Sequence, residues 1–595
     1  MIETLFVIVR NLAEARQAPE AFPGRTLQLI ATNSEVEAFC RAQYGTCVRL
    51  DEKSIKSDYR SINRFAYNTA LKLAREEKDT ARRFFLESHF FDIRTLLIRS
   101  FKCLLVLEKA AASLGIKEIG LFNDPSSLIA LVATSQPVTE KKWVVTLAPA
   151  LPTRPTRKSF EFKKIISSFL APISNLEARR YFSGTRRKKL LIASGSLTHL
   201  TPVLEELRAS MDILFWENQF NLEKYRYCRA HGLHFMILPE RKKIHPFEKH
   251  PLSGGGKISF EGRDVSVLCD AVFARFGLIG FLNRDFDEQA VFAAFSKFRP
   301  DALLLDEDMA IRRTLCIAAR DRSVPAFVIP HGVPIVWTFK EGDTPPHYVP
   351  SATLLVNSEF EKRANQRVCY DPARVVVTGT PRYDRIAEWK RTSKKIAGSG
   401  KTILYCGAIM QPYDFDGLSV LASLMGQRNL AQDFMQTYLT DTVWAIGAAP
   451  DVHMKIKPHY AEEAVWENIL RPLENSRQHE VVSHRENILA LTAEADIIIT
   501  TPSSIICEAL LFEKPVIVLD YETDGMSEPY EKLGAARVVK NREELKRAIQ
   551  DYLFSPDSLE ALAKQRQALG NDLTGFADGG NTRRAAQLIQ KSLGL

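Results

Sequence analysis

The sequence predicts an α/β protein in which two consecutive doubly wound domains follow an extra small α/β domain. Three observations carry this prediction. Short β-branched runs that are apolar on both faces, such as Ile497–Ile499 and Val516–Leu519, are typical of strands buried in a parallel sheet. Helical patterns alternate with such runs along most of the chain. With 595 residues, the chain is also too long for a single hydrophobic core.

The alternation of strand and helix starts three times, which divides the chain into five predicted parts. The first stretch has strand candidates at Leu5–Val9, Leu27–Ala31 and Ile119–Phe122, and a helical region from about Ile62 to Leu114. A Lys-, Ser- and Gly-rich stretch near residue 395 is typical of a linker. The predicted parts are an extra α/β domain (1–150), a basic linker (151–188), a first doubly wound domain (189–389), a short linker (390–400) and a second doubly wound domain (401–595).

The two doubly wound domains are predicted from their strand candidates. In the first domain these are Leu190–Ala193, Ile213–Trp216, Phe235–Leu238, Ala302–Leu305, Ala326–Ile329, Leu354–Val356 and Val375–Val377. In the second they are Ile403–Tyr405, Val452–Ile456, Val481–Val482 and the two runs named above. Helices are expected between most strands, and after the last strand at Arg542–Leu553, Leu559–Leu569 and about Thr582–Leu593.

The net charge of +9 is concentrated in residues 151–190, which hold eleven basic and two acidic residues. A positive field confined to one segment favours an anionic membrane surface as partner, and not nucleic acid, whose binders carry basic residues along the fold. Aromatic and aliphatic residues alternate with Lys163 and Lys164, as in a basic amphipathic segment. The alternative is a solvated linker between domains.

The nine cysteines are scattered and form no C-x-x-C pair, which indicates a reducing compartment and argues against a zinc site or a disulfide framework. Leu5–Val9 follows the acidic Glu3 and ends at Arg10, so we interpret it as a strand and not as a signal peptide. No apolar run approaches 18 residues. The sequence therefore predicts a cytoplasmic protein, either free or peripheral on the inner face of the cell membrane, with no metal and no cofactor.

The stretch from Ala495 to Asp520 predicts a strand, a helix and a strand with a nucleotide site at the turn. Thr501 suits the N-cap and Pro502 the first helical position, so Ser503 and Ser504 fall in the first turn beside free N–H groups. Hydroxyl groups and the positive end of a helix suit a phosphate. Glu508 follows Ser504 by one helical turn, where a ribose diol would fit. The alternative is a plain buried unit with capping serines and a solvated glutamate.

Four motifs in order resemble those of GT-B glycosyltransferases, in particular the CDP-glycerol glycerophosphotransferases and related enzymes of capsule and surface polysaccharide biosynthesis. They are Pro330–Pro334 (P-H-G-V-P), Val377–Asp384 (V-T-G-T-P-R-Y-D), Lys455–His459 (K-I-K-P-H) and the stretch from Ala495 to Asp520. The resemblance covers about residues 189–553. It implies a GT-B fold of two doubly wound domains, with the nucleotide-sugar donor bound by the second.

Each role in transfer from a nucleotide-activated donor has a candidate residue. Ser503 and Ser504 would anchor the phosphate, while Lys457 and His459 would stabilise the leaving group. Gly407, after the first strand of the second domain, permits close approach of the donor.

The base candidates lie in the first domain. The resemblance implies His331 as the base, with Asp306 in reserve. Asp306-Glu307-Asp308 also has the D-x-D form that binds metal-bound nucleotides in another glycosyltransferase fold.

These observations predict a metal-independent glycosyltransferase. It would move a sugar, or a polyol phosphate, from a nucleotide-activated donor to a cell-surface polysaccharide or lipid-linked glycan precursor. The nucleotide, CMP or CDP or UDP, is left open. The alternatives are an enzyme like the non-hydrolysing UDP-sugar 2-epimerases and a non-catalytic scaffold that binds nucleotide sugars.

Overall fold

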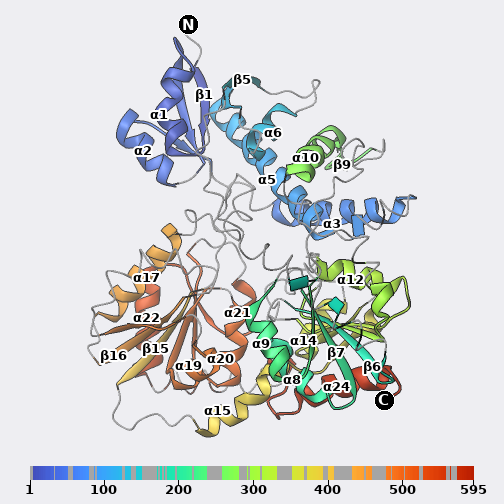
Figure 1. The fold of residues 1–595 in the computed structure, drawn as a ribbon. Coiled ribbons are helices and arrows are strands. Elements are labelled where there is room, and N and C mark those ends of the chain that lie inside the picture. The colour runs from blue at the N-terminus through green and yellow to red at the C-terminus, as the bar shows by residue number, and fades with distance from the viewer. Residues whose placement is uncertain are drawn as a thin grey trace. The chain divides into compact units, whose positions relative to one another are not determined.

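The computed structural model describes residues 4–595 with gaps. The residues outside the description are 1–3, 33, 51–57, 79–82, 84–85, 88–89, 124–126, 136–142, 150–169, 172–174, 177, 179, 181–183, 195–196, 218–219, 238–256, 280–290, 292–294, 308–310, 331–351, 367–370, 393–399, 408–431, 448–450, 459–477, 484–485, 502, 522–526, 556, 558–559, 561–562 and 564–571. By its contacts the chain forms two compact units (Figure 1). Unit 1 is Met1–Phe162, Glu240–Asp287 and Gln411–Leu430, and unit 2 is Lys163–Pro239, Glu288–Met410 and Ala431–Leu595.

Unit 1 contains a five-stranded parallel sheet in the order β3-β2-β1-β4-β5. Its strands are β1 (Thr4–Val9), β2 (Thr26–Ala31), β3 (Val48–Arg49), β4 (Glu118–Phe122) and β5 (Val144–Ala148). Its helices are α1 (Leu12–Ala21), α2 (Ser34–Tyr44), α3 (Tyr59–Glu76), α5 (Phe90–Leu114) and α6 (Leu128–Thr134). The α/β alternation expected for the start of the chain is therefore present.

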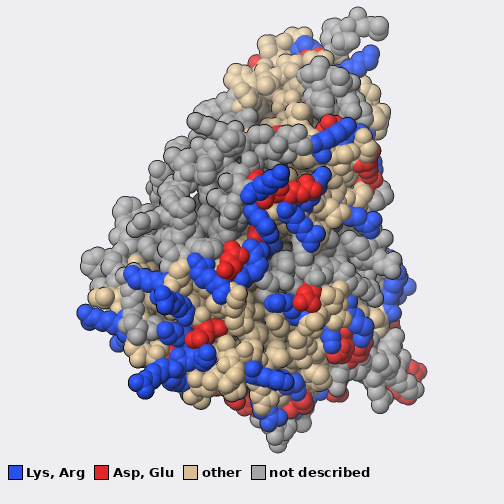
Figure 2. Space-filling model, turned by 90° about the vertical axis from the view of Figure 1, so that its right-hand side faces the viewer, with Lys and Arg blue, Asp and Glu red and all other residues tan. Residues whose placement is uncertain are grey.

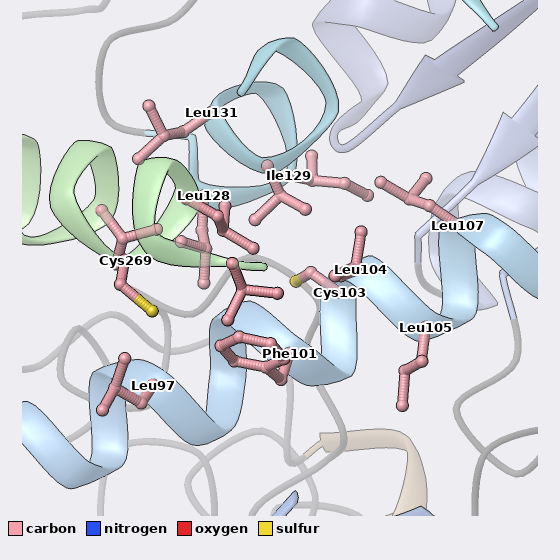
Figure 3. Close-up of a cluster of buried hydrophobic side chains, with 14 of the residues drawn as sticks. Leu97, Phe101, Cys103, Leu104, Leu105, Leu107, Leu128, Ile129, Leu131 and Cys269 are labelled. Atoms are coloured by element: carbon pink, nitrogen blue, oxygen red, sulfur yellow. The ribbon is translucent and has the colours of Figure 1, made fainter. Parts of the chain in front are cut away.

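A distant segment completes the core of unit 1. The hairpin β9 (Ser259–Phe260) and β10 (Arg263–Asp264) and the helix α10 (Ser266–Ile279) pack with α5 and α6, and Figure 3 shows the side chains of these three helices converging. Arg263 Nη1 also lies 2.8 Å from Glu108 Oε1. The predicted domain limits had assigned this segment to the first doubly wound domain.

The first sheet of unit 2 has seven parallel strands in the order β14-β13-β12-β11-β6-β7-β8. They are β6 (Lys188–Ala193), β7 (Met211–Glu217), β8 (His234–Ile237), β11 (Ala302–Leu305), β12 (Ala326–Val328), β13 (Thr353–Val356) and β14 (Val375–Val377). Around them lie α8 (Leu197–Leu207), α9 (Leu222–Ala230), α12 (Ile311–Arg320), α14 (Glu359–Gln366) and the 3-10 turns η4 (Pro372–Arg374) and η5 (Pro381–Arg385). The helix that follows η5, α15 (Ile386–Thr392), packs in the core of the second sheet. The strand order reverses between β6 and β11, as in doubly wound folds.

The second sheet of unit 2 has six parallel strands in the order β17-β16-β15-β18-β19-β20. They are β15 (Lys401–Cys406), β16 (Val452–Lys457), β17 (His479–Val481), β18 (Ile497–Thr500), β19 (Val516–Leu519) and β20 (Arg537–Val539). Its helices are α17 (Gln432–Ile446), α19 (Ile488–Glu494), α20 (Ile505–Leu511), α21 (Glu528–Lys532) and α22 (Arg542–Phe554). The two predicted doubly wound sheets are thus confirmed.

The apolar runs are buried on both faces, as their composition predicts. Ile498 of β18 packs in the core that contains α19 and α20, whereas Ile497 and Ile499 pack with α17 and α22 on the opposite face (Figure 1). Because successive side chains of a strand alternate between faces, both faces must be apolar when helices cover both.

The helix expected near Thr582–Leu593 is α24 (Asn581–Ser592), and it packs on the first sheet. Its Ala585, Ala586 and Ile589 share a buried cluster with residues of α8 and β6. The Asp384 carboxylate accepts the backbone N–H groups of Asn581 and Thr582 at 2.8 Å each. The end of the second domain is therefore anchored on the first.

Charge on the described surface is mixed. On the face drawn in Figure 2, basic and acidic side chains are interspersed. Most of the basic segment 151–190 lies outside the described residues, so its expected membrane contact stays a prediction. Among the helices that the structure describes, none combines the length and apolarity needed to cross a bilayer. The eight cysteines of the described part are buried, and none of them forms a disulfide bond there.

Candidate functional site

The strand register gathers several predicted residues at the carboxyl edge of the second sheet. Cys406, the last residue of β15, pairs with Lys457 on one side and Thr500 on the other. Gly407 N donates to Lys457 O at 3.0 Å. The strand order reverses between β15 and β18, so this edge is the switch point where open α/β sheets bind ligands. Gly407, Lys457 and the Thr501–Ser504 turn therefore lie together at this edge of the sheet.

The turn after β18 differs from the expected helix start. Thr501 and Pro502 were expected to begin the helix, but α20 begins at Ile505 with Ser504 at the N-cap position, and Pro502 lies outside the described residues. Ser503 O and Ser504 O accept the N–H groups of Ile506 and Cys507 at 3.3 and 3.1 Å, which are three-residue bonds of a tighter turn. The N–H groups of Ile506 and Cys507, in the first turn of the helix as it is observed, thus bond within the chain.

Hydroxyl groups nevertheless remain at this turn. Ser503 and Ser504 are partly exposed, and Ser503 Oγ lies 3.5 Å from Ile505 N. Thr501 is 4% exposed, and within the described part of the chain its Oγ1 has no hydrogen-bond partner. A buried hydroxyl without a partner is costly unless a ligand or water completes it. The turn therefore offers hydroxyl groups to a phosphate.

Glu508 is buried and ion-paired, so the alternative of a solvated glutamate is wrong. Its side chain is 3% exposed and its carboxylate pairs with the guanidinium of Arg382. Arg382 belongs to the Val377–Asp384 motif, just after the last strand of the first sheet. The structure thus joins two of the four motifs at one buried ion pair.

Burial and the neighbouring charges shift the pKa values around Glu508 in opposite directions. Burial raises the pKa of Glu508 above its ordinary value, while Arg382 and Lys457 lower it. Burial lowers the pKa of Lys457, which Cys406, Glu486 and Glu508 oppose. Burial would likewise lower the pKa of Arg382, but Glu508, Tyr383 and Cys507 together more than offset it, so the pKa is raised and the guanidinium stays charged.

The carboxyl edge of the first sheet carries a second charged cluster, which we call the first-sheet cluster. It contains Ser194, Glu217, Lys224, Asp306, Glu307 and Arg312. Asp306 is 1% exposed, accepts Ser194 Oγ at 2.8 Å, and has Arg312 Nε at 3.6 Å. Lys224 pairs with Glu217 and donates to Ser194 O. The cluster spans the switch point between β6 and β11, where the opposite charges compensate one another.

Two predicted histidines and one residue of the predicted D-x-D motif are not among the residues that the structure describes. His331 and His459 lie outside the described residues, as does Asp308. His331 follows the carboxyl end of β12, and Ile329 N bonds to Leu305 O of the neighbouring strand at 2.9 Å. Within the described residues, no group of three metal-ligating side chains is found.

Sequence reasoning did not single out Arg382 or the residues that pair with Asp306. Arg382 stood in a motif quoted for its resemblance, and the signal available in the sequence was an arginine between a proline and a tyrosine. Partners such as Arg312 carry no local pattern, because they meet Asp306 and Glu307 only through the fold.

A comparison with protein families tests the resemblance of the four motifs to the glycerophosphotransferases. Residues 350–591 match the model of the family CDP-Glycerol:Poly(glycerophosphate) glycerophosphotransferase. The resemblance to this family is therefore confirmed. We call residues 350–591 the glycerophosphotransferase region. It contains Arg382, Gly407, Lys457, the serine pair and Glu508, while Asp306 and His331 precede it. The match supports a transferase.

Solved structures with similarity to the chain include two kinds of protein. The S. aureus MnaA–UDP co-structure has 14% identity and a TM-score of 0.45, over 69% of this chain and 97% of that one. UDP-GlcNAc 2-epimerase from Neisseria meningitidis, bound to UDP-GlcNAc, has 13% identity and a TM-score of 0.44, over 68% and 99%. The wall teichoic acid polymerase TagF has 11% identity and a TM-score of 0.41, over 73% and 99%. No curated protein matched the sequence.

Proposed function

We propose that the protein moves a glycerol phosphate, or a related polyol phosphate or sugar, from a nucleotide-activated donor to a hydroxyl group of a cell-surface glycan precursor. One observation carries the proposal. Within the glycerophosphotransferase region, the candidates Gly407, Lys457 and Ser503–Ser504 lie at the switch point of the second sheet, and Glu508 follows them on α20. A site there suits the phosphate and ribose of a nucleotide.

The proposed step for a CDP-activated polyol phosphate is a displacement at phosphorus. The acceptor oxygen attacks the phosphorus that carries the polyol, a new P–O bond forms, and the phosphoanhydride bond breaks. CMP leaves with the electron pair of that bond, and the hydroxyl proton passes to a base. His331 is our first candidate for the base and Asp306 the second, since Asp306 is already held by Ser194 and Arg312.

Charge on the leaving phosphate needs a counterpart in the second domain. Lys457 at the end of β16 and His459 two residues later are the proposed groups, with the hydroxyls of the Thr501–Ser504 turn beside them. These groups would take the place of a metal ion, so the proposed reaction is metal-independent.

The test is donor turnover by the purified full-length protein. CDP-glycerol, CDP-ribitol and UDP-GlcNAc are each supplied with a lipid-linked glycan acceptor, and released CMP or UDP is measured. We expect acceptor-dependent release from one donor, abolished in His331→Ala while that variant still binds nucleotide. Isomerisation of a UDP-sugar without acceptor would favour the epimerase alternative. Binding without turnover of any donor would favour the scaffold.

A further inference from the structure

The ion pair of Arg382 and Glu508 connects the end of the first domain to the proposed donor site. Arg382 lies in η5 and Glu508 in α20 of the second domain. The side chains are 18% and 3% exposed, respectively. In a charge pair this far from water, each partner compensates the charge of the other, and removing one partner leaves the other uncompensated.

The turn that carries Arg382 is tightly held. Tyr383 is fully buried, accepts Arg382 Nη2 at 3.3 Å, and its ring centroid lies 5.1 Å from the guanidinium carbon. Gly379 has φ +78°, and a Cβ there would lie 1.9 Å from Asn581 Oδ1. Asp384 caps α24 from the same turn. These contacts fix the direction of the Arg382 side chain before any ligand binds.

The groups that face Glu508 come from several elements, and they differ in sign. Arg382 and Lys457 supply positive charge, from η5 and β16. Tyr383 of η5, Cys406 of β15 and Cys507 of α20 also interact with the carboxylate, and burial raises the pKa of each. Burial raises the pKa of Glu508, and Arg382 is the largest influence that lowers it. Only the ionised carboxylate accepts hydrogen bonds with both oxygens.

We propose that Arg382 is a positioning residue of the donor site, which holds the ionised Glu508 carboxylate in the orientation that accepts the ribose hydroxyls of the donor nucleotide. Arg382 acts through Glu508 and does not contact the nucleotide. The inference rests on the proposed function, because Glu508 is the ribose-binding residue there. It adds a role for the Val377–Asp384 motif, which extends the donor site to the end of the first domain.

The experiment is calorimetric titration of CDP, with UDP in parallel, into the full-length protein between pH 6 and pH 9. The variants are Arg382→Met, Arg382→Lys, Glu508→Gln and the double variant Arg382→Met/Glu508→Gln. The matched control is Arg385→Met, because Arg385 lies in the same turn but its side chain is 58% exposed and pairs with Glu388. We expect the control to bind as the wild type does.

A positioning role predicts a specific pH profile. Without Arg382 the rise that burial causes in the pKa of Glu508 is opposed by Lys457 alone, so a smaller fraction of the carboxyl group is ionised at a given pH. Arg382→Met should therefore bind CDP at least tenfold more weakly at pH 7 and recover in part toward pH 9. Arg382→Lys should restore part of the affinity. In the Glu508→Gln background, Arg382→Met should have no further effect. Titration of the nucleotide phosphates is common to all variants and cancels in the comparison.

Other outcomes distinguish a failure of the proposed donor site from a failure of the role proposed for Arg382. If neither CDP nor UDP binds the wild type, the donor site of the proposed function is wrong. If CDP binds, but Arg382→Met loses affinity equally at every pH and also in the Glu508→Gln background, Arg382 is structural and the inference is wrong. Should Arg382→Met fail to fold, Arg382→Lys decides, because a positioning role requires its binding profile to shift along the pH axis relative to the wild type.

Discussion

Replacing Glu361 by glutamine should change how the stability of unit 2 depends on pH. Glu361 of α14 is 3% exposed and accepts the backbone N–H of Asn357 at 2.8 Å. Burial raises the pKa of its carboxyl group from 4.5 to about 7, with the Asn357 hydrogen bond acting in the opposite direction. Glutamine keeps the shape and the acceptor but cannot ionise.

The sign follows from proton uptake in the two states. Below pH 4.5 Glu361 is protonated in both the folded and the unfolded protein. Between pH 4.5 and 7 the unfolded chain loses this proton while the folded chain keeps it, so the wild type loses stability as pH rises. At about 1.4 kcal/mol per pH unit, the loss reaches about 3 kcal/mol above pH 7. Glu361→Gln avoids this loss.

The assay is thermal unfolding of wild type and variant at pH 5, 6, 7 and 8. The melting temperature of Glu361→Gln minus that of the wild type should rise across this range by roughly 3 °C, because unit 2 is larger than the 150–250 residues for which 1 kcal/mol shifts the melting temperature by about 2–4 °C. The control is Glu359→Gln on the same helix, where the side chain is 51% exposed. A difference that stays flat with pH for Glu361→Gln, as for the control, would refute the reasoning.

Three further predictions concern the cap of α24, the absence of a metal and the membrane. Asp384→Ala should destabilise the protein by about 1–2 kcal/mol in thermal unfolding, because two capping bonds are lost, whereas Asp384→Asn should lose less; equal losses would contradict the cap. Transfer activity should survive EDTA, and complete loss restored by manganese or magnesium would assign a metal site to Asp306-Glu307-Asp308. Co-sedimentation with anionic vesicles should weaken steeply with salt, since each basic residue of 151–190 near the surface contributes about 1 kcal/mol; binding unchanged in 1 M salt would contradict it.

The strands could be predicted from the sequence, because their residue composition indicates where they lie. Residues such as Ile497–Ile499 are apolar on both faces, and every strand predicted for the two doubly wound sheets is present. The short strand β20 was not predicted, since three residues after a Gly-Ala-Ala stretch give no period to detect. The local sequence pattern therefore predicts the inner strands of a sheet well and short edge strands poorly.

Long-range partners could not be predicted in the same way. The pairing of Arg382 with Glu508, and the packing of Phe260 on Phe65 and Phe101 at 4.9 Å between ring centroids, depend on how distant segments meet. A single sequence, read without aligned relatives, contains no signal for contacts between distant segments. The predicted start of α20 was wrong. Thr501 and Pro502 have the composition of a helix start, but Ser503 and Ser504 belong to a tighter turn and the helix begins at Ile505.

The anchoring of α24 has a consequence for how the chain folds during synthesis. Gln590 and its hydrogen-bond partner Ser210 are 380 residues apart. At about 5–20 residues per second, the ribosome needs roughly 20–80 s to reach α24 after it has made α8. Throughout this interval the apolar face of α8, with Leu200 and Leu204, lacks the helix that covers it. The nascent first domain therefore carries a sticky surface for tens of seconds, which makes it a natural client for chaperones that bind exposed apolar segments.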